Sequence, residues 1–152
     1  MQPGDRFVGA FVRPQPIGTQ FTEWPLHVTV VSWVRGSAST QELEQALAAE
    51  LGDFRPFEAR VGEETLFVNG TVLVNLIQVP SQFEKLLPLV KSAEDTIGLT
   101  FVSTVHPVYK FHVTVQKAER LHEGDSFQVN QLSIVEQKGG YKEVVGEVQL
   151  GA

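Results

Sequence analysis

The spacing of apolar residues along the chain predicts short strands interleaved with two helices. Alternation at every second position indicates a half-buried strand, whereas apolar residues three and four positions apart indicate a helix. The predicted strands cover residues 7–12, 26–34, 57–61, 65–68, 71–79, 101–105, 111–116, 127–136 and 141–150. Asn69-Gly70, between two of them, is typical of a tight hairpin turn. We therefore expect the strands 65–68 and 71–79 to form a hairpin.

Two segments carry the helical pattern. The first is preceded by Ser39, which with Glu42 forms the sequence of a capping box, and its apolar stripe runs to Gly52. The second should begin near Ser81, where Ser81 and Glu84 repeat that spacing, and should end at Gly98. Pro88 lies inside the second segment and predicts a kink or a late start. We expect the first helix to pack against the sheet.

A short segment occurs twice in the chain. His-Val-Thr-Val stands at residues 27–30 and again at 112–115, and an apolar residue precedes each copy. Turn-linked strands follow both copies, so the chain resembles an internal duplication. Half-chains of this size bury little surface alone, and no linker separates them. We therefore predict a single domain over residues 1–152, built from two lobes that share one core.

Composition and charge narrow the classes of function. The chain has 152 residues, no cysteine and a formal net charge of −6. The missing cysteines exclude disulfides, thiolate catalysis and cysteine-based metal sites. The acidic balance disfavours avid binding of long duplex nucleic acid, which depends on many Lys and Arg contacts to phosphate. Without a signal-peptide pattern or a long apolar run, we expect a cytoplasmic protein with no membrane partner.

The repeated segment supplies the candidate chemistry. In an extended strand His27 and Thr29 point to one side, and His112 and Thr114 do the same. If a pseudo-two-fold axis relates the two copies, two imidazoles and two hydroxyls surround one point. One imidazole can accept a proton while the other donates one, as reactions at phosphorus require, and the hydroxyls can bind phosphate oxygens. This arrangement needs neither a metal nor another cofactor.

Three other interpretations of the same segments stay open. Both histidines could be ordinary surface residues of strands. The site could bind a nucleotide without catalysis, although both intact segments favour an enzyme. A metal hydrolase with histidine ligands is the weakest alternative, because Glu23 is the carboxylate nearest to His27 in sequence and none lies within six residues of His112.

At these residues the chain resembles the two-histidine phosphoesterase superfamily, which includes 2'-5' RNA ligase-like proteins and cyclic nucleotide phosphodiesterases. The resemblance covers most of the chain. It implies an α+β fold, bilobal and internally duplicated, with two mainly antiparallel sheets, helices outside and a central groove. It also implies metal-independent action on a 2',3'-cyclic phosphate or 2'-5' phosphodiester by His27 and His112, with Thr29 and Thr114 holding the phosphate. The implied partner is a small nucleotide or RNA end, bound by a monomer.

Four further residues are candidates for substrate binding. Many members of the superfamily carry an arginine shortly after the second segment, where this chain has Gln-Lys-Ala, so Lys117 is the nearest replacement. Arg35 could attract a phosphate, and Tyr109 and Tyr141 could line the groove. The missing arginine argues against long RNA as a substrate.

Overall fold

The structure, a computed structural model, describes residues 1–68, 70–102, 110–117 and 119–151. The predicted Asn69-Gly70 turn is therefore only partly within the described residues, and Tyr109 lies outside them. The elements are β1 (Arg6–Phe11), β2 (Gln20–Phe21), β3 (His27–Arg35), α1 (Thr40–Leu51), β4 (Phe57–Phe67), β5 (Val72–Ile77), α2 (Ser81–Thr96), β6 (Thr100–Phe101), β7 (His112–Thr114), β8 (Ser126–Val129), β9 (Gln131–Gln137) and β10 (Lys142–Gln149).

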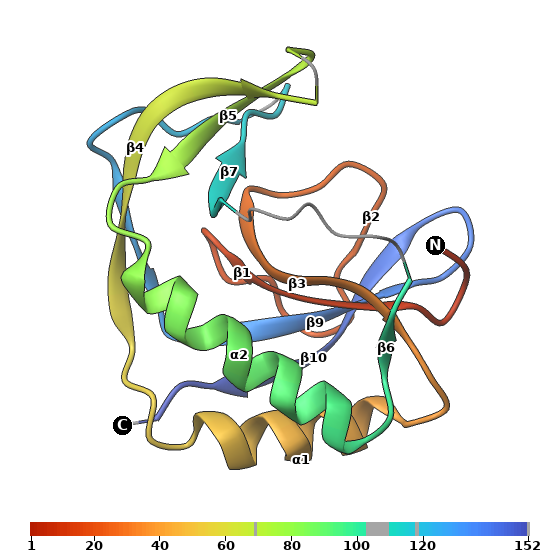
Figure 1. The fold of residues 1–152 in the computed structure, drawn as a ribbon. Coiled ribbons are helices and arrows are strands. Elements are labelled where there is room, and N and C mark those ends of the chain that lie inside the picture. The colour runs from red at the N-terminus through yellow and green to blue at the C-terminus, as the bar shows by residue number, and fades with distance from the viewer. Residues whose placement is uncertain (69, 103–109, 118, 152) are drawn as a thin grey trace.

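The strands form two antiparallel sheets, which confirms the predicted α+β class. The larger sheet has the order β2-β10-β9-β1-β3-β6, and the smaller has the order β7-β5-β4-β8. Strands β3 and β7, which carry the two repeated segments, belong to different sheets and contact each other. Figure 1 shows β7 beside β5, above the strands of the larger sheet.

The two lobes are not the two consecutive halves of the chain. Strands β9 and β10 come from the C-terminal end but pair with β1 and with each other in the larger sheet. Strand β7 pairs with β5, from the first half, in the smaller sheet. The expectation of two sequential half-domains is therefore wrong in this respect. Because each sheet takes strands from both halves, neither half holds a complete sheet of its own.

The predicted helices are present, but only one of the predicted caps forms. Helix α1 begins after Ser39, whose hydroxyl accepts a hydrogen bond from the Glu42 N–H at 3.1 Å. Helix α2 has Pro80 at its N-cap without a side-chain hydrogen bond, because Ser81 is already the first helical residue. Helix α1 packs against α2 and β10, while α2 also contacts β3. No described helix has the length and apolar character needed to cross a membrane.

The division into strands differs from the prediction in two places, several strand ends are shifted, and β2 was not predicted. The predicted strands 57–61 and 65–68 are one strand, β4, whose pairing with β5 is irregular between Val61 and Glu64. The predicted strand 127–136 is two strands separated by Asn130, since β8 pairs with β4 and β9 pairs with β1. The apolar alternation stops at residues 62–64 although β4 continues there, and it shifts by one residue at Asn130, where the chain passes from one sheet to the other.

Apolar side chains on the two faces of the larger sheet form separate clusters. The main core joins Val28 and Val30 of β3 to both helices and to the smaller sheet. The second cluster contains Phe7 and Phe11 of β1, with Trp24 packed against it. We call the face that carries Phe7, Phe11, His27 and Thr29 the histidine face, because the first repeated segment lies on it. The opposite face of β3 therefore packs against the main core through Val28 and Val30.

Candidate active site

Strand β3 places His27 and Thr29 on the histidine face. Both side chains are partly buried, whereas Val28 and Val30 between and after them are fully buried in the main core. The His27 Nδ1 atom lies 2.8 Å from the Pro25 carbonyl oxygen. Because a carbonyl oxygen only accepts, Nδ1 carries the proton, and Nε2 of the neutral ring is left with its lone pair. The first repeated segment therefore presents a histidine of fixed tautomer.

Strand β7 repeats this arrangement in the smaller sheet. His112 and Thr114 are partly buried and Val113 between them is buried in the main core. The His112 Nδ1 atom donates to the Lys110 carbonyl oxygen, also at 2.8 Å. The two copies of the segment therefore hold their imidazoles in the same tautomer, through the same hydrogen bond to a backbone carbonyl oxygen.

The strands that carry the two imidazoles, β3 and β7, contact each other. Burial lowers the pKa of His27 to about 4, although its bond to Pro25 opposes the shift, and the charge on His112 lowers this pKa by a smaller amount. Burial also lowers the pKa of His112, against the effect of the bond to Lys110. Both free rings are therefore largely neutral at pH 7.

An aromatic ring packs against each histidine. The centroid of the Trp24 ring lies 4.4 Å from that of His27, and the centroid of Phe67 lies 4.6 Å from that of His112. Phe7 and Phe11 also contact His27, with centroids 5.6 Å and 6.1 Å away. These rings remove water from the imidazoles, which explains the lowered pKa values. The strand pattern did not single out Phe67, because nothing in the sequence pairs it with His112.

A cavity of about 310 Å³ lies next to the first segment. Its lining combines Trp24 and Leu26 beside His27 with Gln116 and Glu119 from the loop after β7. Glu23 and Arg13 also line it, and Arg13 Nη1 forms an ion pair with Glu119 Oε1 at 3.0 Å. Loops that follow β1 and β7 therefore meet across this cavity. Because Arg13 is paired with Glu119, Glu23 leaves this lining with one net negative charge, which disfavours binding of an anion.

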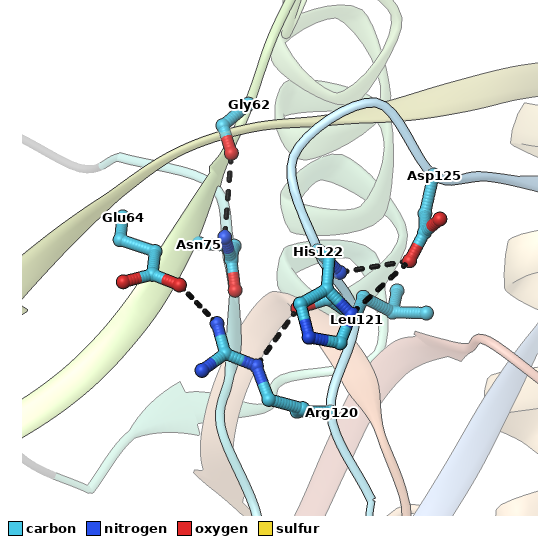
Figure 2. Close-up of polar contacts among 7 residues, drawn as sticks. All are labelled: Gly62, Glu64, Asn75, Arg120, Leu121, His122 and Asp125. Atoms are coloured by element: carbon cyan, nitrogen blue, oxygen red, sulfur yellow. Dashed lines mark hydrogen bonds and ion pairs between the residues drawn. The ribbon is translucent and has the colours of Figure 1, made fainter.

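The loop that follows the second repeated segment is hydrogen-bonded to the smaller sheet through Arg120. Figure 2 shows Arg120 between Glu64 of β4 and the Leu121 carbonyl oxygen, with hydrogen bonds to both. Farther along this loop, the backbone N–H of His122 donates to Asp125 at 2.8 Å, while the His122 ring is exposed. Arg120 therefore holds this loop against β4, a role that no local sequence pattern indicates.

The candidate substrate-binding residues have different positions. Lys117 is exposed in the loop that directly follows β7, next to the cavity residue Gln116. Arg35 lies at the opposite end of β3 from His27 and makes two hydrogen bonds to Asp5, at 2.8 and 2.9 Å. Tyr141 is exposed before β10, at the same far end, since Arg6 pairs with both Val34 and Glu136. The structure therefore does not bring Arg35 or Tyr141 to the histidines.

Within the described residues, no group of three or more His, Asp or Glu side chains has the arrangement to hold a metal ion. The site described above is built from imidazoles, hydroxyls and aromatic rings.

Comparison with known proteins identifies the family. The sequence profile described as the 2'-5' RNA ligase superfamily matches residues 5–139, so the chain belongs to this superfamily. The match includes both repeated segments, and it confirms the resemblance drawn from their residues. No curated protein matches the sequence significantly.

Solved structures share the fold at low sequence identity. The crystal structure of E. coli LigT complexed with 3'-AMP is 14% identical, with a TM-score of 0.62 over 99% of this chain and 100% of that one. The LigT complex with NADP+ is 15% identical, with the same TM-score and full coverage of both chains. TT0787 of Thermus thermophilus is 20% identical, with a TM-score of 0.59 over 96% of this chain and 97% of that one. The two-sheet architecture is therefore common to these proteins.

Proposed function

We propose that the protein is a metal-independent phosphodiesterase or RNA ligase-like enzyme that acts on a 2',3'-cyclic phosphate or a 2'-5' phosphodiester. One observation carries the proposal: strands β3 and β7 contact each other, and the histidine on each strand donates Nδ1–H to the carbonyl oxygen two residues earlier. Both Nε2 atoms are therefore available for proton transfer at one phosphate.

The difference in environment assigns the two proton-transfer roles. The pKa of His27 falls to about 4, chiefly through burial and partly through the charge on His112. When the pair holds one proton, His112 is therefore its favoured carrier. In hydrolysis of a cyclic phosphate, His27 Nε2 removes a proton from water as the water oxygen attacks phosphorus. His112 Nε2 gives its proton to the ribose oxygen that leaves, and a phosphate monoester results.

The negative charge of the bound substrate supports the protonated state of His112. Burial lowers the pKa of His112 in the free protein, but an anionic phosphate beside the ring favours its charged form. The hydroxyls of Thr29 and Thr114 donate hydrogen bonds to phosphate oxygens. Lys117 adds positive charge from the loop after β7, in the region where the sequence lacks the superfamily's arginine.

Charge around the site favours a small substrate. The chain carries a net charge of −6, and Glu23 leaves one negative charge in the cavity beside His27, where Arg13 is paired with Glu119. A nucleotide or RNA end with one reacting phosphate avoids the repulsion that a longer polyanion meets there. E. coli LigT has been crystallised with 3'-AMP and with NADP+, so a related protein accepts small nucleotides. Since one chain supplies both histidines, a monomer suffices for the activity.

A crystal structure with a nucleoside 2'-monophosphate tests the proposal. We expect the phosphate to lie within hydrogen-bonding distance of Nε2 of both His27 and His112, and of both threonine hydroxyls. A nucleotide bound elsewhere, with the imidazoles untouched, would contradict it. A nucleotide bound at the histidines by a protein without turnover would instead favour a nucleotide-binding module.

A further inference from the structure

His112 lies on a short strand at the edge of its sheet. Strand β7 covers only His112–Thr114 and is the last strand in the order β7-β5-β4-β8, whereas His27 lies on a nine-residue strand inside the larger sheet. The His27 ring is in contact with the aromatic side chains of Phe7, Phe11 and Trp24. Since both imidazoles make the same hydrogen bond to a backbone carbonyl oxygen, they differ in the side chains packed around them.

The Phe67 ring reaches His112 across a whole strand. Phe67 is the last residue of β4, and β5 lies between β4 and β7 in the sheet. Adjacent strands are about 4.8 Å apart, so β4 and β7 are separated by roughly twice that distance. The two ring centroids are nevertheless 4.6 Å apart, at an interplanar angle of 72°. The Phe67 ring therefore leans over β5 toward β7, and it meets His112 edge to face.

Burial on the same side of β5 agrees with this position of the ring. Val74 of β5 pairs with Thr65 of β4 and with Thr114 of β7, so these side chains share the face that carries His112. Phe67, two residues after Thr65, belongs to this face as well. Val74 is 0% exposed although it belongs to neither apolar cluster, and a ring that crosses β5 here accounts for its burial.

The backbone directly after Phe67 is held in a strained conformation. Val68 has a φ of +55°, in the left-handed region that a β-branched residue rarely adopts. The Thr71 N–H donates to the Phe67 carbonyl oxygen at 3.1 Å, and the Thr71 hydroxyl donates to the Val68 carbonyl oxygen at 2.6 Å. Such strain persists where surrounding contacts impose it, and it is concentrated at functional sites. Leu66 and Val68 gain no burial from it, since they are 57% and 66% exposed. The conformation instead fixes the end of β4 that carries Phe67.

We infer that Phe67 is a positioning residue, which holds the His112 imidazole so that its Nε2 atom points to the leaving oxygen of the substrate. The bond from Nδ1 to the Lys110 carbonyl oxygen fixes one point of the imidazole, about which the ring can still turn. Contact with the Phe67 ring at a second place removes that freedom. Orientation matters because a misplacement of about 1 Å can cost about 100-fold in rate. The inference rests on the proposed function, in which His112 is the proton donor.

Steady-state kinetics on Phe67 variants tests the inference. We expect Phe67→Ala to lower kcat for a nucleoside 2',3'-cyclic phosphate about tenfold or more and to change KM by less than about threefold. Phe67→Tyr retains the ring and should keep kcat near that of the unmodified protein. Phe67→Leu retains apolar volume without a ring, so its kcat should be lower than that of Phe67→Tyr. Leu66→Ala, at the exposed neighbouring position of β4, is the matched control and should leave kcat unchanged.

Nuclear magnetic resonance of the histidine nitrogens reports the same contact without turnover. At about pH 8, where both rings are neutral, the hydrogen bond to Lys110 gives His112 the Nδ1–H tautomer. A ring released from Phe67 should shift toward the Nε2–H tautomer, which a neutral histidine side chain prefers in water. Phe67→Ala should therefore change the His112 nitrogen signals and leave those of His27 in place. The unchanged His27 signals also show that the variant is folded.

Several outcomes would overturn the inference: an unchanged kcat in Phe67→Ala, an equal loss of kcat in Leu66→Ala, or an unchanged His112 tautomer. A raised KM with unchanged kcat would also overturn it, because Phe67 would then bind the substrate rather than position His112. If Phe67→Ala does not fold, the comparison of Phe67→Leu with Phe67→Tyr decides the question. Absence of turnover by the unmodified protein would instead contradict the proposed function, and the nitrogen signals would still show whether Phe67 holds the ring.

Discussion

The imidazoles of His27 and His112 are held by the same hydrogen bond, from Nδ1 to the carbonyl oxygen two residues earlier, with a length of 2.8 Å in both. The two rings come from different sheets, whose strands β3 and β7 contact each other. A shared tautomer leaves Nε2 of both rings for the substrate. The two histidines therefore act as one proton-transfer unit. Loss of either one should lower the catalytic rate almost as much as loss of both.

Removing either imidazole tests this unit directly. We expect His27→Ala and His112→Ala each to lower kcat for a nucleoside 2',3'-cyclic phosphate by about 100-fold or more. The double variant should be little worse than either single one, because half of a proton relay supports little reaction. Steady-state kinetics measures all three. Losses that simply multiply would show that the two histidines act independently.

The pH dependence of kcat/KM follows from the two shifted pKa values. His27 must be neutral to act as base, and its pKa is about 4, so activity should rise as the pH increases through this value. His112 must be protonated to act as acid, and its pKa is lowered from 6.5, so activity should fall before neutral pH. We expect a bell-shaped profile with its maximum between about pH 4 and pH 6.5. A maximum above pH 7 would contradict these roles.

The threonines should contribute less than the histidines. Thr29→Ala and Thr114→Ala each remove one hydrogen bond to a charged phosphate, which is worth about 1.5 to 3 kcal/mol. We expect kcat/KM to fall about 10- to 100-fold, and Thr29→Ser and Thr114→Ser to retain most of the activity. If the serine variants are as impaired as the alanine variants, the hydroxyls do not bind the phosphate.

The repeated segment made the candidate histidines predictable. Alternation alone placed His27 and Thr29 on one face with Val28 buried behind them, and the structure shows this burial pattern. The sequence could not reveal that β9 pairs with β1 and β10 with β2, because these pairings link residues more than a hundred positions apart. Similarly, Ser81 has the spacing of a cap, but the helix begins one residue earlier than that cap requires.

Contacts between distant segments were equally hidden. The ring of Phe67 reaches His112, and Arg13 pairs with Glu119, although nothing in either local pattern indicates these partners. Conversely, Arg35 was a reasonable candidate for phosphate binding until the structure placed it beside Asp5. Local periodicity predicts which way a side chain points, whereas only the tertiary arrangement shows what it meets.

The buried carboxyl group of Glu94 should make the free energy of unfolding depend on pH, independently of the two histidines. This side chain is 2% exposed, its Oε2 atom has no hydrogen-bond partner among the described residues, and burial raises its pKa to about 8. The folded state therefore holds a proton that the unfolded state releases near pH 4.5, so this residue's contribution to stability decreases as pH rises from 4.5 to 8. Glu94→Gln should become more stable than the unmodified protein over this range, by on the order of 4 kcal/mol at pH 8.

Urea unfolding between pH 4.5 and pH 8.5 measures this difference. Glu123→Gln, at an exposed position in the loop before β8, serves as the control and should follow the unmodified protein at every pH. A constant difference between Glu94→Gln and the unmodified protein across the range would show that Glu94 does not take up a proton on folding.

Turnover of a nucleoside 2',3'-cyclic phosphate in excess EDTA tests the central claim, that His27 and His112 together catalyse reaction at phosphorus without a metal. Product formation is followed by ³¹P NMR, with His112→Ala measured in parallel. We predict steady hydrolysis to a phosphate monoester in EDTA by the unmodified protein, and a rate at least about 100-fold lower for His112→Ala. Activity that EDTA abolishes and a divalent ion restores, or no turnover at all by a protein that binds the nucleotide, would contradict the account.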